Sequence, residues 1–152
     1  MTYKNEAYVV DTSVTAKLFV NEEHNDKARL LYQQASQKEI SLFAPDLTWY
    51  ELNSVLTKAQ LALEDIQRHL FVFQELVHNG VIEIVPFSLV LLNKAAKLAS
   101  MDTQGKGYIS SFDATFHALA LLKKAIFITA DKTHYNKTKD LIGSVIQLED
   151  FS

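Results

Sequence analysis

The sequence predicts an α/β protein in which a parallel β-sheet is covered by helices on both faces. Short apolar segments alternate along the chain with longer segments whose apolar residues recur at helical spacing. The first apolar segment, residues 8–10, is apolar throughout, as strands buried on both faces are. It stops on an acid, Asp11, at the end where open α/β sheets place their ligands. These three observations make a parallel sheet the expected framework of the protein.

The individual elements follow from local signals taken in chain order. Thr12 or Ser13 is expected to cap a short helix after the first strand, and Gly80 to end a later helix in the left-handed conformation. The predicted strands are residues 8–10, 40–44, 82–85, 125–129 and 144–148. The predicted helices are residues 14–20, 21–37, 46–60 (opening at Pro45 or Asp46), 64–77, one marked by Leu91, Leu92, Ala95, Leu98 and Ala99, then 110–123 and 133–140.

The composition is that of one packed domain comprising residues 1–152. Of the 152 residues, 48% are hydrophobic and 22% charged. No apolar run approaches 18 residues and the N-terminus shows no apolar signal segment, so we expect no membrane span. The absence of cysteine excludes disulfides, thiolate zinc sites and cysteine nucleophiles, and agrees with a cytoplasmic location. The net charge of −3 argues against a polyanion partner unless a metal and a local basic patch attract it.

Asp11 follows the first strand directly. Its alternative role is that of a helix N-cap, which is common where a strand turns into a helix. Two other folds that place an Asp here fit less well. Haloacid-dehalogenase-type phosphatases need a second Asp two residues on, where this chain has Ser13. Receiver domains end a late strand with a lysine, whereas Lys124 precedes its strand.

Glu51 and Asp131 are two further acids in unusual surroundings. Glu51 shares a helix face with Leu47 and Val55, so its charge is costly unless something compensates it; the alternative is an exposed glutamate at the edge of the apolar stripe. Asp131 follows the apolar segment 125–129, and its alternative role is again an N-cap. Because parallel strands end at one edge, Asp11 and Asp131 should lie close together if their strands are neighbours.

Asp113 lies in SSFDATFHALALL, a helix that is apolar almost all round except for Asp113 and His117. Alternatively, Ser110 and Asp113 resemble a capping box, and an acid in the first turn suits the helix dipole. We interpret His117 as a surface residue or a support for ligands, because a lone helical histidine is seldom a ligand. The other histidines have no patterned partners, so no Ser-His-Asp arrangement is predicted; they are His24, His69, His78 and His134.

The joint occurrence of these acids predicts a cation site. All four occupy strand ends or helix starts expected at one edge of the sheet: Asp11, Glu51, Asp113 and Asp131. Four carboxylates without a partner would repel one another and shift one another's pKa, and a divalent cation removes that conflict. With no cysteine and no clustered histidine, oxygen ligands favour Mg²⁺ or Mn²⁺ over zinc.

Four segments resemble, in order and spacing, the motifs of PIN-domain nucleases: YVVDTSVTAKLF, APDLTWYELNSVL, SSFDATFHALALL and IFITADKTHY. Among these the chain is most similar to the VapC-like ribonuclease toxins of toxin–antitoxin pairs. The resemblance implies a three-layer α/β/α sandwich with a central parallel sheet. The family's acids carry over onto Asp11, Glu51, Asp113 and Asp131. Its other pocket residues carry over onto Thr12, Thr129 and Asn53. Phe112 departs from the tyrosine that commonly precedes the third acid.

The resemblance implies Mg²⁺- or Mn²⁺-dependent hydrolysis of RNA. Asp11 would bind the metal most directly, with Asp113 and Asp131 holding it or a second ion. Glu51 would position or deprotonate the attacking water, and cleavage would leave a 5′ phosphate and a 3′ hydroxyl. The family also pairs with a small antitoxin protein and often forms a homodimer, so both partners are expected.

Two rival functions stay open. One is a metal-dependent DNase or phosphatase with the same site chemistry. The other is a non-catalytic partner-binding domain whose acids bind a regulatory ion or an arginine of another chain. Three lysines near the acids in sequence could contact phosphates, although the sequence favours a solvated surface position for each: Lys17, Lys106 and Lys132.

Overall fold

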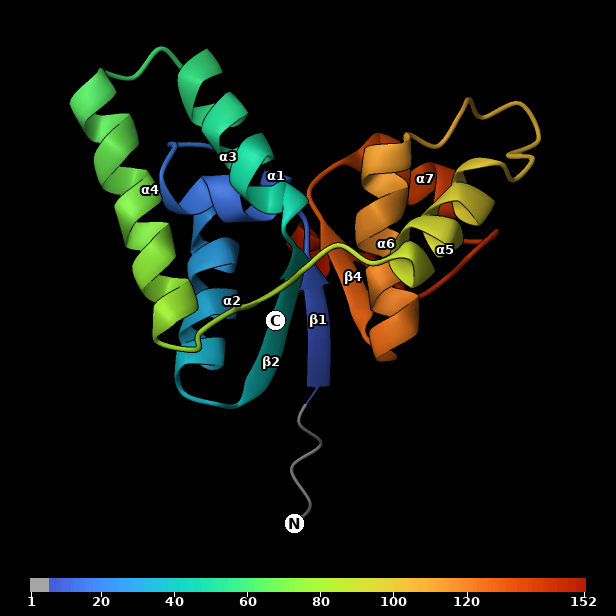
Figure 1. The fold of residues 1–152 in the computed structure, drawn as a ribbon, viewed down its shortest axis with the longest axis horizontal. Coiled ribbons are helices and arrows are strands. Elements are labelled where there is room, and N and C mark those ends of the chain that lie inside the picture. The colour runs from blue at the N-terminus through green and yellow to red at the C-terminus, as the bar shows by residue number, and fades with distance from the viewer. Residues whose placement is uncertain (1–5) are drawn as a thin grey trace.

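A computed structural model describes residues 6–152 and shows a five-stranded, all-parallel sheet between two layers of helices (Figure 1). The sheet order is β3-β2-β1-β4-β5. The strands are β1 (Glu6–Val10), β2 (Ile40–Pro45), β3 (Glu83–Val85), β4 (Ile126–Thr129) and β5 (Val145–Gln147). The predicted α/β class with a central parallel sheet is confirmed. Residues 1–5 of the predicted domain lie outside the described residues.

Helices cover both faces of this sheet. On one side lie α2 (Asn25–Ser36), α3 (Leu47–Lys58) and α4 (Leu63–His78), and on the other α5 (Leu89–Ala99), α6 (Ser111–Lys123) and α7 (Lys132–Thr138) (Figure 1). Helix α1 (Thr12–Thr15) and a 3₁₀ turn (Ala16–Leu18) follow β1, and a second 3₁₀ turn (Leu148–Asp150) follows β5. Within residues 6–152, no helix is both long enough and apolar enough to cross a membrane.

The apolar residues of β1 serve two separate cores. Tyr8 and Val10 pack into the core beneath α2–α4, whereas Val9 packs into the core beneath α5 and α6 together with Phe116 and Phe127. Successive side chains of a strand point to opposite faces, so an uninterrupted apolar strand is what a two-sided sheet requires. The central strand therefore holds Asp11 firmly at its carboxyl end.

Several boundaries differ from the predicted ones for local reasons. The helix predicted over residues 21–37 begins at Asn25, because the Asn25 side chain bonds the Glu22 amide and the Val20 carbonyl and folds the preceding residues into a turn. The first helix begins after Asp11, not after the predicted caps, and tightens into a 3₁₀ turn. Gly80 adopts a φ of 74°, as predicted for a left-handed helix end.

Candidate active site at the carboxyl edge of the sheet

Asp11 is the innermost residue of the site. Only 6% of it is exposed, and its Oδ2 accepts hydrogen bonds from Ser13 Oγ and Thr129 Oγ1, both at 2.7 Å. It occupies the N-cap position of α1, but its side chain makes no capping hydrogen bond. Burial raises the pKa of Asp11 above its ordinary value, against the lowering effect of the two hydroxyls, and the charge of Asp131 raises it further.

Asp131 lies beside Asp11 because β4 pairs with β1. The two strands are therefore neighbours, as the sequence analysis required for these acids to lie close together. Its backbone N–H donates to Thr129 Oγ1 at 3.0 Å. Its Oδ1 accepts from the amides of Thr133 (2.9 Å) and His134 (3.3 Å), so the N-cap role is present as well. Neither amide engages Oδ2, so capping uses only one of the two oxygens.

Glu51 reaches the same edge from α3. Its Oε1 accepts a 2.8 Å hydrogen bond from Thr12 Oγ1, and the side chain is half-buried, not freely exposed. Burial raises the pKa of Glu51, and the charge of Asp11 adds to that effect. Asn53, two residues on, is exposed, and within residues 6–152 its side chain makes no hydrogen bond to the acids.

Asp113 comes from the first turn of α6. The Ser110 hydroxyl accepts from the amide of Phe112, so the capping box considered for Asp113 is not formed. Burial, which is the largest cause, and the charges of the other three acids together raise the pKa of Asp113 to about 7. Since all three act on Asp113, the four carboxylates belong to one cluster.

This cluster lacks a compensating cation. Within residues 6–152, no lysine or arginine forms an ion pair with any of the four acids, and Lys137, which opposes the rise in the pKa of Asp113, donates its Nζ to the Tyr108 carbonyl. A hard divalent cation fits this set of carboxylate oxygens in both charge and ligand type. In the same residues no three side chains converge as a preformed metal cage, so the acids form an open cluster.

Sequence reasoning missed a buried histidine pair beside Asp113. His117 Nδ1 lies 3.0 Å from His134 Nε2, and His117 Nε2 lies 2.8 Å from the Gly143 carbonyl. His117 is therefore not a surface residue, and His134 does have a partner. His134 Nδ1 is 4.0 Å from Asp113 Oδ2, but burial lowers the pKa of His134 to about 4, so at pH 7 this contact is not an ion pair. No periodicity could reveal the pair, because its members lie on different helices.

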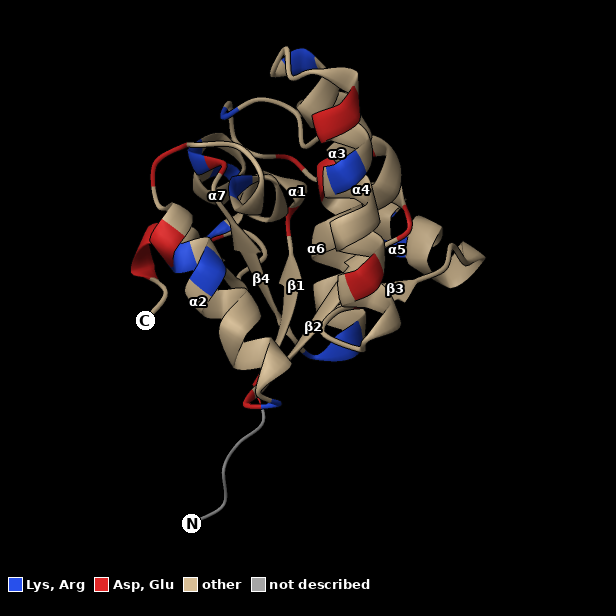
Figure 2. Ribbon diagram, turned by 90° about the vertical axis from the view of Figure 1, so that its left-hand side faces the viewer, with Lys and Arg blue, Asp and Glu red and all other residues tan. Residues whose placement is uncertain are grey.

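The three lysines singled out from the sequence are placed differently from one another. Lys17 is almost fully buried and pairs with Glu22 at 3.1 Å. Lys106 donates to the backbone carbonyl of Asn136, and Lys132 opens α7 directly after the fourth acid. In the view of Figure 2, Lys and Arg positions alternate with Asp and Glu positions along the helices that face the viewer.

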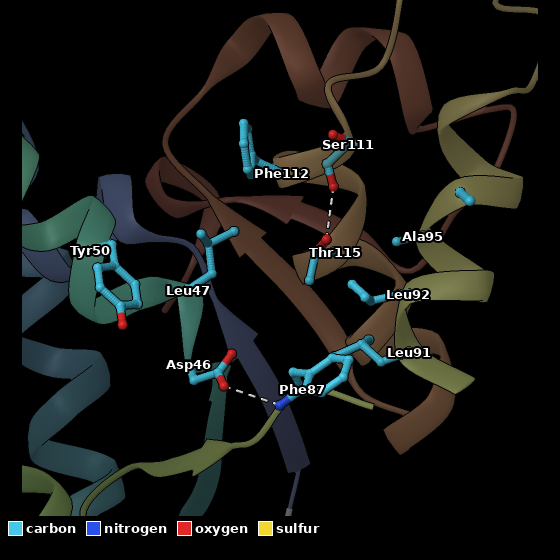
Figure 3. Close-up of a pocket in the computed structure, with 11 residues that line it drawn as sticks. Asp46, Leu47, Tyr50, Phe87, Leu91, Leu92, Ala95, Ser111, Phe112 and Thr115 are labelled. Atoms are coloured by element: carbon cyan, nitrogen blue, oxygen red, sulfur yellow. Dashed lines mark hydrogen bonds between the residues drawn. The ribbon is translucent and has the colours of Figure 1, made fainter. Parts of the chain in front are cut away.

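An apolar pocket of about 380 Å³ lies between the start of α3 and helices α5 and α6 (Figure 3). Tyr50 and Phe112, the residues directly before the second and third acids, line it and are 77% and 59% exposed. Asp46 also lines the pocket, and its Oδ2 accepts from the Phe87 amide at 3.1 Å. Two residues of the pocket lining are therefore sequence neighbours of acids in the cluster, although none of the four acids lines the pocket itself.

The family model of the PIN domain matches residues 8–140 of the chain. This chain belongs to the PIN-domain family. Membership confirms the resemblance seen in the four motifs and places the protein in a family of nucleases. No curated protein sequence matches the chain significantly.

Solved structures share the PIN fold with this chain at low identity. A chain of VapBC2 from Rickettsia felis, crystallised with a DNA fragment from their promoter, is 17% identical over 93% of this chain and 96% of its own, with a TM-score of 0.67. PAE2754 from Pyrobaculum aerophilum is 22% identical over 97% and 93%, with a TM-score of 0.63. VapC20 from Mycobacterium tuberculosis, described as a sarcin–ricin loop cleaving toxin, is 18% identical over 78% and 84%, with a TM-score of 0.60.

Proposed function

We propose that this PIN domain is a Mg²⁺- or Mn²⁺-dependent endoribonuclease and the toxin of a toxin–antitoxin pair. The observation that carries the proposal is that the acids of the four motifs gather at one edge of the sheet with no lysine or arginine paired to them within residues 6–152. Thr129 bonds both Asp11 and the Asp131 amide, Thr12 bonds Glu51, and the charges of these three acids help to raise the pKa of Asp113. Family membership supports a nuclease, and the description of VapC20 as a toxin that cleaves the sarcin–ricin loop supports RNA as the substrate.

Each acid has a role that its surroundings support. Asp11, Asp113 and Asp131 would hold the cation, and Glu51 would orient or deprotonate the attacking water. When bound, the cation would lower the pKa of that water and offset the charge that develops at phosphorus. Thr12 holds one oxygen of Glu51, and the raised pKa of Glu51 suits a group that must accept a proton. Attack by water at phosphorus leaves a 5′ phosphate and a 3′ hydroxyl.

The neighbouring structures support an antitoxin partner. VapBC2 from Rickettsia felis and FitAB were each solved bound to a DNA fragment, and another matched structure is a toxin–antitoxin complex from Klebsiella pneumoniae. We propose that residues 1–152 act as one domain, in the cytoplasm, as a homodimer, and under the control of a small antitoxin.

The experiment is a substrate profile with mapped product ends. Purified protein is incubated with RNA, with single- and double-stranded DNA and with a small phosphate ester, each with Mg²⁺, with Mn²⁺ and with excess EDTA. We expect metal-dependent cleavage of RNA alone, with 5′ phosphate ends. Cleavage of DNA or the ester instead would favour the rival hydrolase. No hydrolysis of any substrate by folded, metal-loaded protein would favour the partner-binding role.

A further inference from the structure

The loop between α5 and α6, residues 100–110, projects from the end of the molecule towards which the strands run (Figure 1). Its Tyr108 is 93% exposed, the highest exposed fraction of any large hydrophobic residue within residues 6–152. The next residue, Ile109, is buried in the core beneath α5 and α6. The chain at Tyr108 is therefore anchored to the core while its ring lies in solvent.

Two lysines fasten this loop to α7. Lys137 of α7 donates its Nζ to the Tyr108 carbonyl at 2.7 Å. In the other direction, Lys106 of the loop donates its Nζ to the Asn136 carbonyl at 3.3 Å. Gly107 adopts a φ of 95°, which suits glycine, and a Cβ there would lie 3.4 Å from Lys137 Cε. These contacts hold the backbone at Tyr108 in place before any ligand arrives, which lowers the entropy cost of binding.

Tyr108 lines a hollow of about 230 Å³ together with Met101 and two glycines, Gly105 and Gly107. Pockets for drug-sized ligands measure about 300–1,000 Å³, so this hollow suits a smaller group. Both glycines are exposed, so they present backbone and not side chains to a ligand. An aromatic face beside exposed backbone fits a flat ring with hydrogen-bonding groups at its edge, and an unpaired nucleobase is such a ring.

A second hollow, of about 160 Å³, adjoins the first, because Asp102 and Thr103 line both. Lys106 and Lys137 also line this second hollow, where the two acids are Asp102 and Asp140. Two ammonium groups therefore lie next to the hollow that the tyrosine lines.

The loop lies beside the acid cluster. It ends at Ser110, the N-cap of α6, and Asp113 lies in the first turn of that helix. Lys137, whose Nζ is bonded to the loop, also acts with its charge on the Asp113 carboxylate. A nucleic-acid strand with one phosphate at the acids therefore meets this loop with a neighbouring nucleotide.

Sites for single-stranded nucleic acids combine cationic side chains that contact phosphates with aromatic rings on which bases stack. Protein interfaces instead centre on an apolar cluster, whereas the residues directly before Tyr108 are glutamine, lysine and glycine. We propose that Tyr108 stacks on one unpaired nucleobase of the bound strand, and that Lys106 and Lys137 contact the phosphates next to it. The inference rests on the proposed function for the identity of that strand, which is RNA.

The test is a binding measurement with substitutions of Tyr108. Fluorescence anisotropy is measured with labelled probes of about a dozen nucleotides, within the usual size of such sites. The probes are unstructured single-stranded RNA, duplex RNA and single-stranded DNA, each with Ca²⁺ to occupy the acids. Tyr108→Ala removes the ring and Tyr108→Phe keeps it. Phe71→Ala is the matched control, because Phe71 is a 59%-exposed aromatic residue on α4, on the other side of the sheet.

Tyr108→Ala should weaken the binding of single-stranded RNA by about 5–150-fold, the range for the loss of one base–aromatic stack. Tyr108→Phe and Phe71→Ala should keep the wild-type Kd, and duplex RNA should bind all four proteins alike, because its bases are already stacked. An unchanged Kd in Tyr108→Ala, an equal loss in Tyr108→Phe, or the same loss with duplex RNA would overturn the inference. Failure of the wild type to bind either single strand would overturn it too. A Tyr108→Ala protein that binds RNA normally but loses its native protein partner would assign the ring to a protein interface instead.

Lys106→Ala tests the phosphate contact. Each phosphate contact with a single strand contributes about 0.7 to the slope of log Kd against log salt concentration, so the slope should fall by that amount whatever the base sequence. Lys123→Ala, at the opposite end of α6, is the control and should keep the wild-type slope. An unchanged slope in Lys106→Ala would refute the phosphate contact.

Cleavage kinetics separate this inference from the proposed function. RNA cleavage in which Tyr108→Ala leaves KM unchanged would refute the nucleobase site and leave the proposed function intact. Binding of single-stranded DNA that depends on Tyr108, in a protein that cleaves no RNA, would retain the nucleobase site and sink the proposed substrate.

Discussion

The Thr129 hydroxyl at the end of β4 donates a 2.7 Å hydrogen bond to Asp11 Oδ2 at the end of β1, across 118 positions of sequence. The same hydroxyl oxygen accepts the backbone N–H of Asp131 at 3.0 Å. Thr129 is fully buried, so these bonds are made without competition from water. One threonine thus links the acid of the first motif to the backbone of the fourth.

Thr129→Val should therefore lower the free energy of unfolding, although the two side chains have nearly the same size and shape. Valine matches the shape of threonine but leaves the part-buried Asp131 amide without its partner, which costs about 1–3 kcal/mol, and removes one of the two hydroxyls that bond Asp11 Oδ2. Urea denaturation at pH 7 measures the loss. Thr133→Val, at an exposed site, is the matched control and should stay within about 0.5 kcal/mol of wild type. Equal effects of the two would show that the Thr129 bonds contribute nothing.

The edge on which the acids gather could be predicted from the sequence, because it depends on chain direction alone. Once residues 8–10 and 125–129 are parallel strands, Asp11 and Asp131 must lie at the same edge, and the pairing of β1 with β4 then brings them side by side. Asp113 was ambiguous, because an acid in the first turn of a helix also suits the helix dipole.

What the sequence could not supply was the direction in which side chains turn after packing. His117 and His134 are 17 residues apart on different helices, and they meet only because α6 and α7 pack together over Phe127. Likewise, the two oxygens of Asp131 have different surroundings, which no motif distinguishes. Such details arise from tertiary contacts and not from local pattern.

Asp11→Asn should preserve the fold and remove nuclease activity. The asparagine oxygen can still accept from the hydroxyls that bond Oδ2, but the side chain no longer offers the charge at the centre of the cluster. We expect cleavage to fall by more than about 100-fold, the upper range for residues that merely support a metal ligand. Asp26→Asn, an exposed change on α2, is the control for the assay. Full activity in a well-folded Asp11→Asn protein would remove Asp11 from the proposed ligand set.

Activity should require Mg²⁺ or Mn²⁺, with Ca²⁺ a poor substitute. Ca²⁺ prefers more ligands at longer distances, so it would occupy the acids without organising the attacking water. An ion that binds only the folded state also increases the free energy of unfolding, by about 2.7 kcal/mol when the ion concentration is 100 times its Kd. The melting temperature rises accordingly. Initial rates and thermal melts with each ion test both points. Equal rates with Ca²⁺, or cleavage that persists in excess EDTA, would contradict the proposed chemistry.

A partner protein should inhibit by placing a lysine or arginine among the four acids. The cluster has no such ion pair within residues 6–152, and an added cationic group would occupy the place of the metal. The complex is co-purified from the native operon, and the lysines and arginines of the partner are changed to alanine one at a time. One of these changes should restore cleavage of the substrate while the two proteins stay bound to each other. A tight native complex that retains full activity would rule this mode of inhibition out.

Asp113 should make the metal-free protein less stable as the pH rises from about 4 to about 7. Its pKa is about 7 in the folded state against an ordinary value of 3.8, so over this range the folded state holds a proton that the unfolded chain has released. The stability that the folded protein gains from holding this proton on Asp113 is fully present below about pH 4 and is lost as the pH rises through 7. His134 acts in the opposite direction, because its pKa is lowered to about 4, but it is present in wild type and variant alike.

Asp113→Asn keeps a neutral side chain at every pH and isolates this effect. In EDTA, the variant should match wild type near pH 4 and exceed it in stability at pH 7.5, because wild type then carries mutually repelling carboxylates. If Asp113 only served the helix dipole, the variant would instead lose about 0.3–1 kcal/mol at neutral pH. Urea denaturation at both pH values distinguishes the two, and melts with Mn²⁺ add a second criterion, since the variant should lose most of the metal-induced rise. A variant that is less stable at pH 7.5 yet keeps the full Mn²⁺ shift would place Asp113 outside the site and leave Asp11, Glu51 and Asp131 to hold the ion.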